Sequence, residues 1–252
     1  MDPAGLEGVD AVVHLAGESI AAVRWTESKK REILESRERG TRLLARSMAQ
    51  LDRPPATLVS ASGVNYYGDR GAELLTEESP PGEGFLARVC RSWEKATEEA
   101  EDAGVRTAHF RSGMVLSPAG GALGTMLLPF RLGVGGRLGS GRQYVPWIDL
   151  DDHVALILHA LSHSSVEGPV NAVGPGPVPN ATFTSTLGRV LGRPTLIPVP
   201  ALGVRALLGE MGEELLLSGQ RAVPRKAESS GFDFFSEDLE TALRHQLGRA
   251  PS

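Results

Sequence analysis

In the first half of the chain, short β-branched runs alternate with longer amphipathic stretches. The short runs have the apolar character of buried parallel strands and end in small or polar residues; they are residues 10–17, 57–62 and 105–110. Residues 26–49 and 84–103 place apolar positions among many charges, which predicts two surface helices. Strand and helix therefore alternate, and this order predicts a parallel α/β sheet.

The second half of the chain begins with a different pattern. After Arg111, paired and single glycines interrupt an apolar stretch, which predicts a lobe over the sheet that starts at about residue 112 and selects the substrate. Helices are predicted over residues 151–163 and 181–191, with a short strand over residues 169–173 between them. A tail follows from residue 201.

Composition narrows the class of protein. The 252 residues contain 26 Lys and Arg against 31 Asp and Glu, without a basic block, so no nucleic-acid partner is expected. Cys90 is the single cysteine, which excludes an intramolecular disulfide and a cysteine-based zinc cluster and favours a reducing, cytoplasmic location. No apolar run approaches the roughly 20 residues of a membrane span, so no membrane partner is expected.

Several longer strings carry a family resemblance. They are Val12–Glu18, Ser36–Thr41, Ser60–Ser62 with Tyr66–Gly68, Leu128–Gly133, Val145–Asp149 and, in the tail, Gly219–Pro224 and Gly231–Phe234. Through them nearly the whole chain resembles the extended short-chain dehydrogenase/reductases. Within that group it is similar to an atypical, epimerase-family subgroup of NADP-dependent oxidoreductases that carries a small C-terminal domain of unknown function.

The resemblance implies an NAD(P)-binding, Rossmann-like, doubly wound parallel sheet, incomplete at its N-terminal side, with a smaller C-terminal substrate lobe. Residues 1–200 would form the epimerase/dehydratase-like region and residues 201–249 the small C-terminal domain. The implied cofactor is NADP, and Trp147 is the implied substrate contact. The implied cofactor contacts are Leu15, Ala16, Gly17, Glu18, Glu32, Arg37, Ser60, Ala61, Arg111 and Val115.

One departure from the family concerns the cofactor. A dinucleotide fold uses a Gly-rich turn for the pyrophosphate and the end of a second strand for the ribose, and this sequence contains neither. Family members begin earlier, so we expect Met1 to mark a misplaced start, a fragment or a truncated form that holds the cofactor weakly. The strand over residues 10–14 would then have an unpaired edge, which favours self-association.

A second departure concerns proton transfer. The wider family uses a Tyr and, four residues later, a Lys on one helix face, but Leu86 and Cys90 occupy the corresponding positions. If catalysis occurs, the resemblance leaves Ser62, Tyr66 and Tyr67 as the residues beside the nicotinamide that polarise a substrate oxygen.

Each candidate also has a purely structural interpretation. His14, Cys90 and Trp147 suit a packed core, and Arg37 alone would be an ordinary helix charge. A metal site at Asp149, Asp151 and Asp152 is a weaker interpretation than capping of the following helix, so no metal is expected.

Two functions stay open. One is an NADP-dependent oxidoreductase or epimerase that acts on a small polar molecule, sugar-linked molecules being one class. The other is a non-catalytic protein that binds NADP(H) or a partner and lacks the Tyr/Lys proton relay.

Overall fold

The computed structural model describes residues 3–21 and 24–250, and its centre is a four-stranded parallel sheet in the order β1-β2-β4-β8. The strands are β1 (Ala11–His14), β2 (Thr57–Gly63), β4 (Arg106–Ser112) and β8 (Gly168–Ala172). The strands predicted from the apolar runs and their parallel pairing are thus confirmed. In the described part of the chain, β1 pairs with β2 alone, and self-association through this edge stays a prediction.

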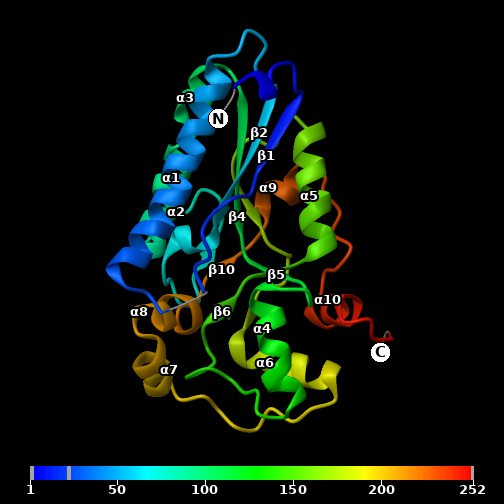
Figure 1. The fold of residues 1–252 in the computed structure, drawn as a ribbon. Coiled ribbons are helices and arrows are strands. Elements are labelled where there is room, and N and C mark those ends of the chain that lie inside the picture. Colours follow the sequence, from blue (N-terminus) through cyan, green and yellow to red (C-terminus); the bar gives the residue numbers. More distant parts are fainter. Residues whose placement is uncertain (1–2, 22–23, 251–252) are drawn as a thin grey trace.

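Helices cover both faces of the sheet (Figure 1). One face carries α1 (Glu27–Ala49), α2 (Phe85–Lys95) and α3 (Glu98–Asp102), and the other carries α5 (Leu150–Ser162) with α9 (Arg225–Ser229). This arrangement confirms the doubly wound α/β fold predicted from the order of elements.

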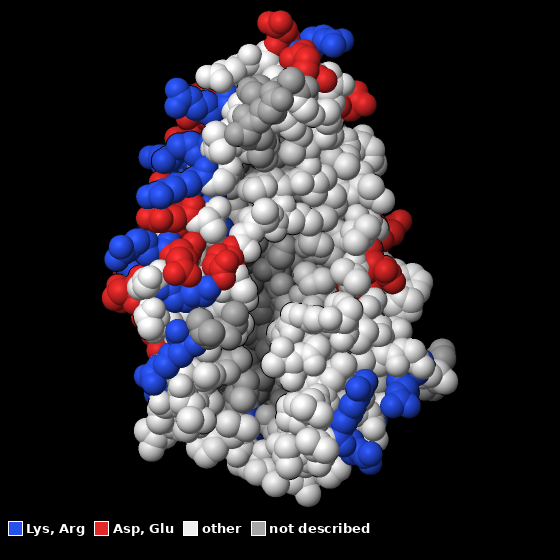
Figure 2. Space-filling view, in the orientation of Figure 1, with Lys and Arg blue, Asp and Glu red and all other residues white. Residues whose placement is uncertain are grey.

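Helix α1 has the amphipathic pattern expected from its sequence. Its start is fixed by the Thr26 side chain, which accepts a hydrogen bond from the Lys29 backbone N–H at 3.1 Å. Ile33, Leu44 and Met48 point into the core, whereas Lys, Arg and Glu side chains line the outer face, which is the most charged surface in Figure 2.

The prediction of one continuous helix over residues 84–103 is wrong. The helix is interrupted between Lys95, where α2 ends, and Glu98, where α3 begins. Between them the buried Thr97 hydroxyl donates to the Glu94 carbonyl at 2.7 Å and lies 3.0 Å from His109 Nε2. A threonine hydroxyl that bonds the backbone and a neighbouring strand competes with continuous helical pairing.

A lobe lies beyond the carboxyl ends of the strands, at the bottom of Figure 1. It is built from β5 (Met114–Leu116), α4 (Gly121–Arg131), β6 (Tyr144–Val145), β7 (Trp147–Asp149), β9 (Val178–Pro179) and α6 (Asn180–Leu191). Its core includes Leu123, Phe130, Trp147, Phe183 and Leu187. The change of pattern after Arg111 thus marks the chain's passage from the sheet into this lobe.

The chain from Ala201 onward spreads over the whole molecule. It forms α7 (Ala201–Leu208), α8 (Glu210–Gly212), the π-helical turn η3 (Glu213–Leu217), β10 (Arg221–Ala222), α9 and α10 (Leu239–Gln246). Strand β10 pairs with β3 (Leu74–Leu75), α9 packs on β8, and α10 packs on α6. This segment therefore packs on both the sheet and the lobe and connects them.

Two short turns complete the fold: η1 (Pro3–Leu6) and η2 (Val64–Tyr67), the latter directly after β2. In residues 3–21 and 24–250, no helix is both long and apolar enough to cross a membrane.

Candidate functional site

A cavity of about 340 Å³ opens at the carboxyl ends of β1, β2 and β4, where ligands bind in open α/β sheets. It is called the larger cavity, because a second cavity nearby has a smaller volume. The lining residues come from the strand ends, α1, α2 and α5: Leu15, Ile20, Arg37, Ala61, Ser62, Gly63, Asn65, Leu86, Val89, Cys90, Trp93, Ser112, Gly113, Val115 and His153. Figure 2 shows this face hollowed between the charged side formed by α1 and the lobe.

Arg37 places a positive charge in the wall of this cavity. Its side chain is buried, its ring-facing guanidinium lies 4.8 Å from the centre of the Trp93 ring, and Nη1 donates to the Ile33 carbonyl at 3.1 Å. Burial lowers the pKa of Arg37, and none of the described carboxylates forms an ion pair with it. A guanidinium has five N–H donors, and among the described residues the Ile33 carbonyl is the hydrogen-bond acceptor found for this one.

The other predicted cofactor contacts divide into two groups. Leu15, Ala61 and Val115 line the cavity with Arg37, and a Cβ on Gly17 would lie only 3.0 Å from the Arg37 Cζ atom. The remaining predicted contacts do not line the cavity. Ala16 is exposed, and Glu18, in the loop after β1, and Glu32 of α1 form ion pairs with Lys29. Ser60 and Arg111 are buried in the sheet.

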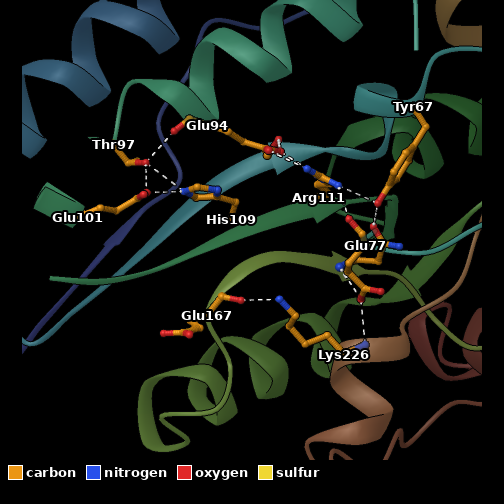
Figure 3. Close-up of polar contacts among 11 residues, drawn as sticks. Tyr67, Glu77, Glu94, Thr97, Glu101, His109, Arg111, Glu167 and Lys226 are labelled. Carbon is orange, nitrogen blue, oxygen red and sulfur yellow. Dashed lines mark hydrogen bonds and ion pairs between the residues drawn. The ribbon is translucent and has the colours of Figure 1, made fainter. Parts of the chain in front are cut away.

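Below the cavity, Glu94 of α2 is the centre of a polar network (Figure 3). The Ser62 hydroxyl donates to Glu94 Oε1 at 2.7 Å, and Arg111 donates to both carboxylate oxygens at 2.8 Å. Burial alone would lower the pKa of Arg111, but the hydrogen bonds and the charge of Glu94 outweigh it and raise that pKa. Ser62 is the member of this network that reaches the cavity.

Tyr66 and Tyr67 contact the same network through Arg111. Tyr67 is fully buried; its hydroxyl donates to Asn171 Oδ1 at 2.6 Å and accepts from Arg111 Nη1 at 3.0 Å. Burial raises the pKa of Tyr67 to about 12. The Tyr66 ring lies 3.5 Å from the guanidinium carbon of Arg111. The structure thus brings Ser62, Tyr66 and Tyr67 together around Arg111, and a catalytic role for them stays a prediction.

Three polar residues of the cavity wall were not predicted from the sequence. Asn65 follows β2, Ser112 ends β4, and His153 projects from α5, with its Nε2 atom 3.0 Å from Ser112 Oγ. Burial lowers the pKa of His153. Ser112 could have been identified from the sequence, because it lies just after a predicted strand. Nothing local in the sequence marks His153 as a residue that faces a cavity.

Cys90 also lines the larger cavity, at the position where the wider family carries its Lys. Burial raises the pKa of its thiol to about 11, so it is a neutral thiol at physiological pH. The interpretation of Cys90 as an inert buried residue agrees with this environment.

A smaller cavity, of about 80 Å³, adjoins the larger one and shares Asn65 with it. Gly68, Asp69 and Glu83 form one side, and Glu214, Ser218 and Gln220 from the C-terminal segment form the other. Gly68 has a φ of 63°, and a Cβ there would lie 2.7 Å from the Glu83 carbonyl oxygen. Glycine therefore allows these two loops to meet and close the cavity.

Trp147 and the acidic residues that follow it have structural partners. Trp147 is fully buried, and its indole N–H donates to the Gly176 carbonyl at 2.7 Å. It packs in the core of the lobe, outside the walls of both cavities, and its predicted contact with substrate stays a prediction. Asp149 caps α5 by accepting from the Asp151 backbone N–H at 2.8 Å, which confirms the predicted capping role.

One group of side chains has the composition of a metal site. Ligand atoms of Asp149, Asp151 and His245 lie within 4.8 Å of one another. Asp149 also accepts a hydrogen bond from Gln246 at 2.9 Å, and His245 Nε2 lies 2.6 Å from Asp151 Oδ2. In this structure the group forms a helix cap and a surface ion pair.

Two family models match the chain. Residues 4–174 match the NAD dependent epimerase/dehydratase family, and residues 199–246 match a domain of unknown function, DUF1731. Among curated proteins, the Epimerase family protein MT2273 of Mycobacterium tuberculosis is 44% identical over 248 residues, which cover 98% of this chain and 82% of that protein.

Two solved structures are similar over nearly the whole chain. The human epimerase family protein SDR39U1, crystallised with NADPH, has a TM-score of 0.92 at 38% identity and covers 97% of this chain and 84% of its own. A nucleoside-diphosphate sugar epimerase from Corynebacterium glutamicum has a TM-score of 0.80 at 38% identity and covers 98% of this chain and 48% of its own.

Proposed function

Because the chain belongs to the NAD dependent epimerase/dehydratase family, we propose that it binds NADP(H) and transfers a hydride between the nicotinamide and a small polar substrate. The observation that carries this proposal is the buried guanidinium of Arg37, which lacks a carboxylate partner in the described part of the chain and lines a cavity at the carboxyl ends of three strands. Such a cation at such a place suits an anionic dinucleotide.

The residues of the larger cavity fit the nicotinamide end of the cofactor. Leu15, Leu86 and Val89 offer an apolar wall for a flat ring, and the 340 Å³ volume falls within the range of small-molecule sites. The relative crystallised with NADPH supports NADP(H) rather than NAD(H). This sequence contains no Gly-rich turn of the kind that holds a pyrophosphate, so the assignment covers the nicotinamide end and Arg37 alone.

The network around Glu94 supplies a route for the proton. When bound, the cofactor supplies the hydride chemistry of the nicotinamide. The Ser62 hydroxyl donates to Glu94, so its lone pairs can accept a hydrogen bond from a substrate hydroxyl. When a substrate carbinol is oxidised, its hydroxyl proton would pass to Ser62 Oγ and the Ser62 proton would pass to Glu94; reduction would reverse both transfers.

Arg111, Tyr66 and Tyr67 act as positioning residues in this scheme. Arg111 orients both oxygens of Glu94, and the two tyrosines fix the guanidinium of Arg111 by stacking and by a hydrogen bond. The apolar side chains around Ser62 limit the access of water to the transferred proton.

A second candidate function is a non-catalytic NADP(H)-binding protein. It is favoured by Leu86 and by the neutral thiol of Cys90, which leave no charged side chain where the wider family has its proton relay. A screen of small polar carbonyl compounds for NADPH oxidation separates the two functions. Turnover that is lost in Ser62→Ala supports the enzyme, and NADPH binding without any turnover supports the alternative.

The cofactor proposal is tested by titrating the protein with NADPH and NADH while following the reduced nicotinamide by fluorescence. We expect tighter binding of NADPH, weakened about 10- to 100-fold in Arg37→Met, because charge-assisted hydrogen bonds contribute about 1.5–3 kcal/mol. Arg39→Met is the matched control, since Arg39 lies on the exposed face of the same helix and pairs with Glu35 at 3.0 Å. Equal affinity of both variants and wild type would contradict the role of Arg37.

Two further expectations belong to this proposal. The single cysteine, Cys90, needs no oxidising compartment, which supports a cytoplasmic location. The partner we propose is a small-molecule substrate, and the mixed charges of the sequence offer no basic block for a nucleic acid.

A further inference from the structure

The lobe carries charge of one sign. Residues 112–148 and 173–209, which include β5, α4, α6 and α7, contain no Asp, Glu or Lys, and their charged side chains are Arg131, Arg137, Arg142, Arg189, Arg193 and Arg205. The whole chain has a formal net charge of −5, so its acidic side chains are concentrated elsewhere. Soluble domains ordinarily intersperse both signs on their surface. On the face shown in Figure 2, the lower part of the lobe has blue side chains and no red ones.

Most of this positive charge is not neutralised by the protein itself. Arg189 pairs with Glu240 of α10, and Arg205 pairs with Glu213 at 2.6 Å. The other arginines are exposed and form no ion pair with a carboxylate of residues 3–21 and 24–250; they are Arg131, Arg137, Arg142 and Arg193. Uncompensated positive charge on a chain that is acidic as a whole favours an anionic partner at this place.

Large aliphatic side chains are exposed along the same stretches. Those with more than half of their surface exposed are Leu128, Leu132, Val134, Leu196 and Ile197. The first three flank Arg131 in the sequence, and the last two follow Arg193, with Leu196 reaching 87% exposure. A single exposed leucine is ordinary, whereas a group of them marks an interaction surface.

Two segments of the chain run side by side to form this surface. Arg193 Nε donates to the Arg131 carbonyl at 2.9 Å, and the Val199 backbone N–H donates to the Arg137 carbonyl at 2.8 Å. The surface lies at the bottom of Figure 1, where the segment that connects α6 with α7 runs along the lower edge of the molecule. We call it the lobe tip; it consists of Leu128, Arg131, Leu132, Val134, Arg137, Arg193, Leu196 and Ile197.

We propose that the lobe tip docks on the surface of an anionic lipid bilayer. The arginines would lie among the headgroups, and the aliphatic side chains would lie at the boundary with the acyl chains. A bilayer accepts exposed aliphatic side chains without a complementary shape, and none of the lobe-tip residues lines either cavity. The combination of unpaired arginines with exposed leucines therefore fits a bilayer in both charge and polarity.

Other partners fit this surface less well. A second copy that docked through the same surface would place arginine against arginine, which is repulsive. The aromatic side chain of this stretch, Phe130, is buried and offers no platform for a nucleic-acid base. A protein that lies on a bilayer needs no membrane-spanning run, so the lack of such a run in the sequence excludes a span and not surface binding.

The experiment is sedimentation of the full chain with vesicles. One set contains equal amounts of phosphatidylserine and phosphatidylcholine, and the other contains phosphatidylcholine alone. We expect the chain to pellet with the anionic vesicles, to be released by added salt, and to stay in solution with the neutral vesicles. Slower hydrogen exchange in residues 128–137 and 193–199 on addition of anionic vesicles would locate the contact at the lobe tip.

Two variants test the two components of the surface. Arg131→Gln should weaken binding to anionic vesicles about fivefold, since an arginine near such a surface contributes about 1 kcal/mol. Leu196→Ser should weaken binding about tenfold, because it removes an aliphatic side chain from the acyl boundary. Both positions are exposed, and thermal unfolding of each variant checks that the fold is kept.

Matched controls lie on helices that cover the sheet. Arg39→Gln on α1 makes the same change of net charge as Arg131→Gln, and Leu158→Ser on α5 removes a leucine that is 60% exposed. Neither residue belongs to the lobe tip, so both variants should pellet as wild type does.

Three results would overturn the docking of the lobe tip on lipid. They are no pelleting with anionic vesicles, equal pelleting with neutral vesicles, and equal binding by wild type, Arg131→Gln and Leu196→Ser. A dimer in lipid-free ultracentrifugation that Leu196→Ser abolished, without any pelleting, would instead identify the lobe tip as an interface between copies. The NADPH titration is independent, because no residue of the larger cavity belongs to the lobe tip.

Discussion

At the residue scale, Tyr67 is the candidate whose environment differs most from its expected role. Its hydroxyl satisfies Asn171 and Arg111 in a fully buried place. We expect Tyr67→Phe to lower the free energy of unfolding by about 1–3 kcal/mol, because a buried acceptor and a buried donor lose their partner. Urea denaturation followed by circular dichroism measures the change.

Tyr66→Phe is the matched control for that variant. The Tyr66 ring stacks on Arg111, but its hydroxyl forms no hydrogen bond with the described residues, so its loss should cost less than about 0.5 kcal/mol. Equal destabilisation by both variants would contradict a structural role for the Tyr67 hydroxyl. If Tyr67→Phe instead folded normally and lost turnover, the catalytic prediction would be favoured.

His153 makes a prediction about pH. Burial holds the pKa of His153 in the folded chain below the unfolded value of 6.5. As the pH falls below 6.5, the unfolded chain therefore binds a proton at this residue before the folded chain does. The free energy of unfolding should therefore fall as the pH drops below 6.5, by at most about 1.4 kcal/mol per pH unit for one group. Urea titrations between neutral and mildly acid pH should show a shallower fall in His153→Asn.

His245 provides the opposite sign as a control. The hydrogen bond that the protonated His245 ring donates to the Asp151 carboxylate raises the folded pKa of His245. This residue therefore stabilises the fold below pH 6.5 and loses that contribution as the pH rises through the raised value. His245→Asn should thus steepen the fall of stability toward acid pH. The same slope in wild type and both variants would show that neither histidine is linked to folding as described.

Single residues differ in how far the sequence predicted them. The family resemblance, now confirmed, identified Ser62, Arg37 and Val115, which line the larger cavity, because each belongs to a motif next to a strand end or on the first helix. Glu94 carried no comparable signal. Its place in the polar network depends on Ser62, 32 residues away, and this pairing exists only once the sheet has formed.

At the element scale, the position of α2 depends on the C-terminal segment. The N-cap residue of α2, Gly84, has no side chain to satisfy the first N–H groups, and Glu214 accepts from two of them. Glu214→Gln leaves one oxygen acceptor and removes a charge that favours a helix N-terminus. We expect a loss of about 1–2 kcal/mol of unfolding free energy, together with faster hydrogen exchange at Phe85 and Leu86.

The neighbouring Glu213 supplies the control for this helix. It pairs with Arg205 at 2.6 Å on the surface, and surface pairs contribute little, so Glu213→Gln should change stability by less than about 0.5 kcal/mol. A similar loss in both variants would contradict the capping role of Glu214 and point to a general effect of charge.

Elements were predictable where the local pattern sufficed. The apolar runs and the Thr26 cap predicted β1, β2, β4 and α1 correctly, because a few adjacent residues determine a buried parallel strand or the start of an amphipathic helix. The interruption of the second helix at Thr97 escaped prediction, since it depends on His109 of β4 and not on a Gly or Pro in the helix.

At the scale of the whole molecule, the C-terminal segment from Ala201 onward connects the sheet with the lobe. Asn171 at the end of β8 donates to the Val223 carbonyl at 3.0 Å, and the buried Glu77 accepts from the backbone of both Asn171 and Lys226 at 3.1 and 3.0 Å (Figure 3). Apolar side chains of the same segment complete three separate clusters: Met211 beside α2, Ala227 under the sheet and Leu243 in the lobe. Removal of the segment would expose apolar side chains in all three clusters.

A chain that ends at Pro200 tests this view of the architecture. We expect it to lose cooperative thermal unfolding, because it exposes Phe183 and Leu187 in the lobe and leaves Glu77 buried without its N–H partner at Lys226. Differential scanning calorimetry of this variant beside the full chain measures the transition. A sharp transition near that of the full chain would mean that residues 201–249 are a separate small domain, as the sequence suggested, and that the contacts through Val223 and Lys226 contribute little to the stability of the sheet.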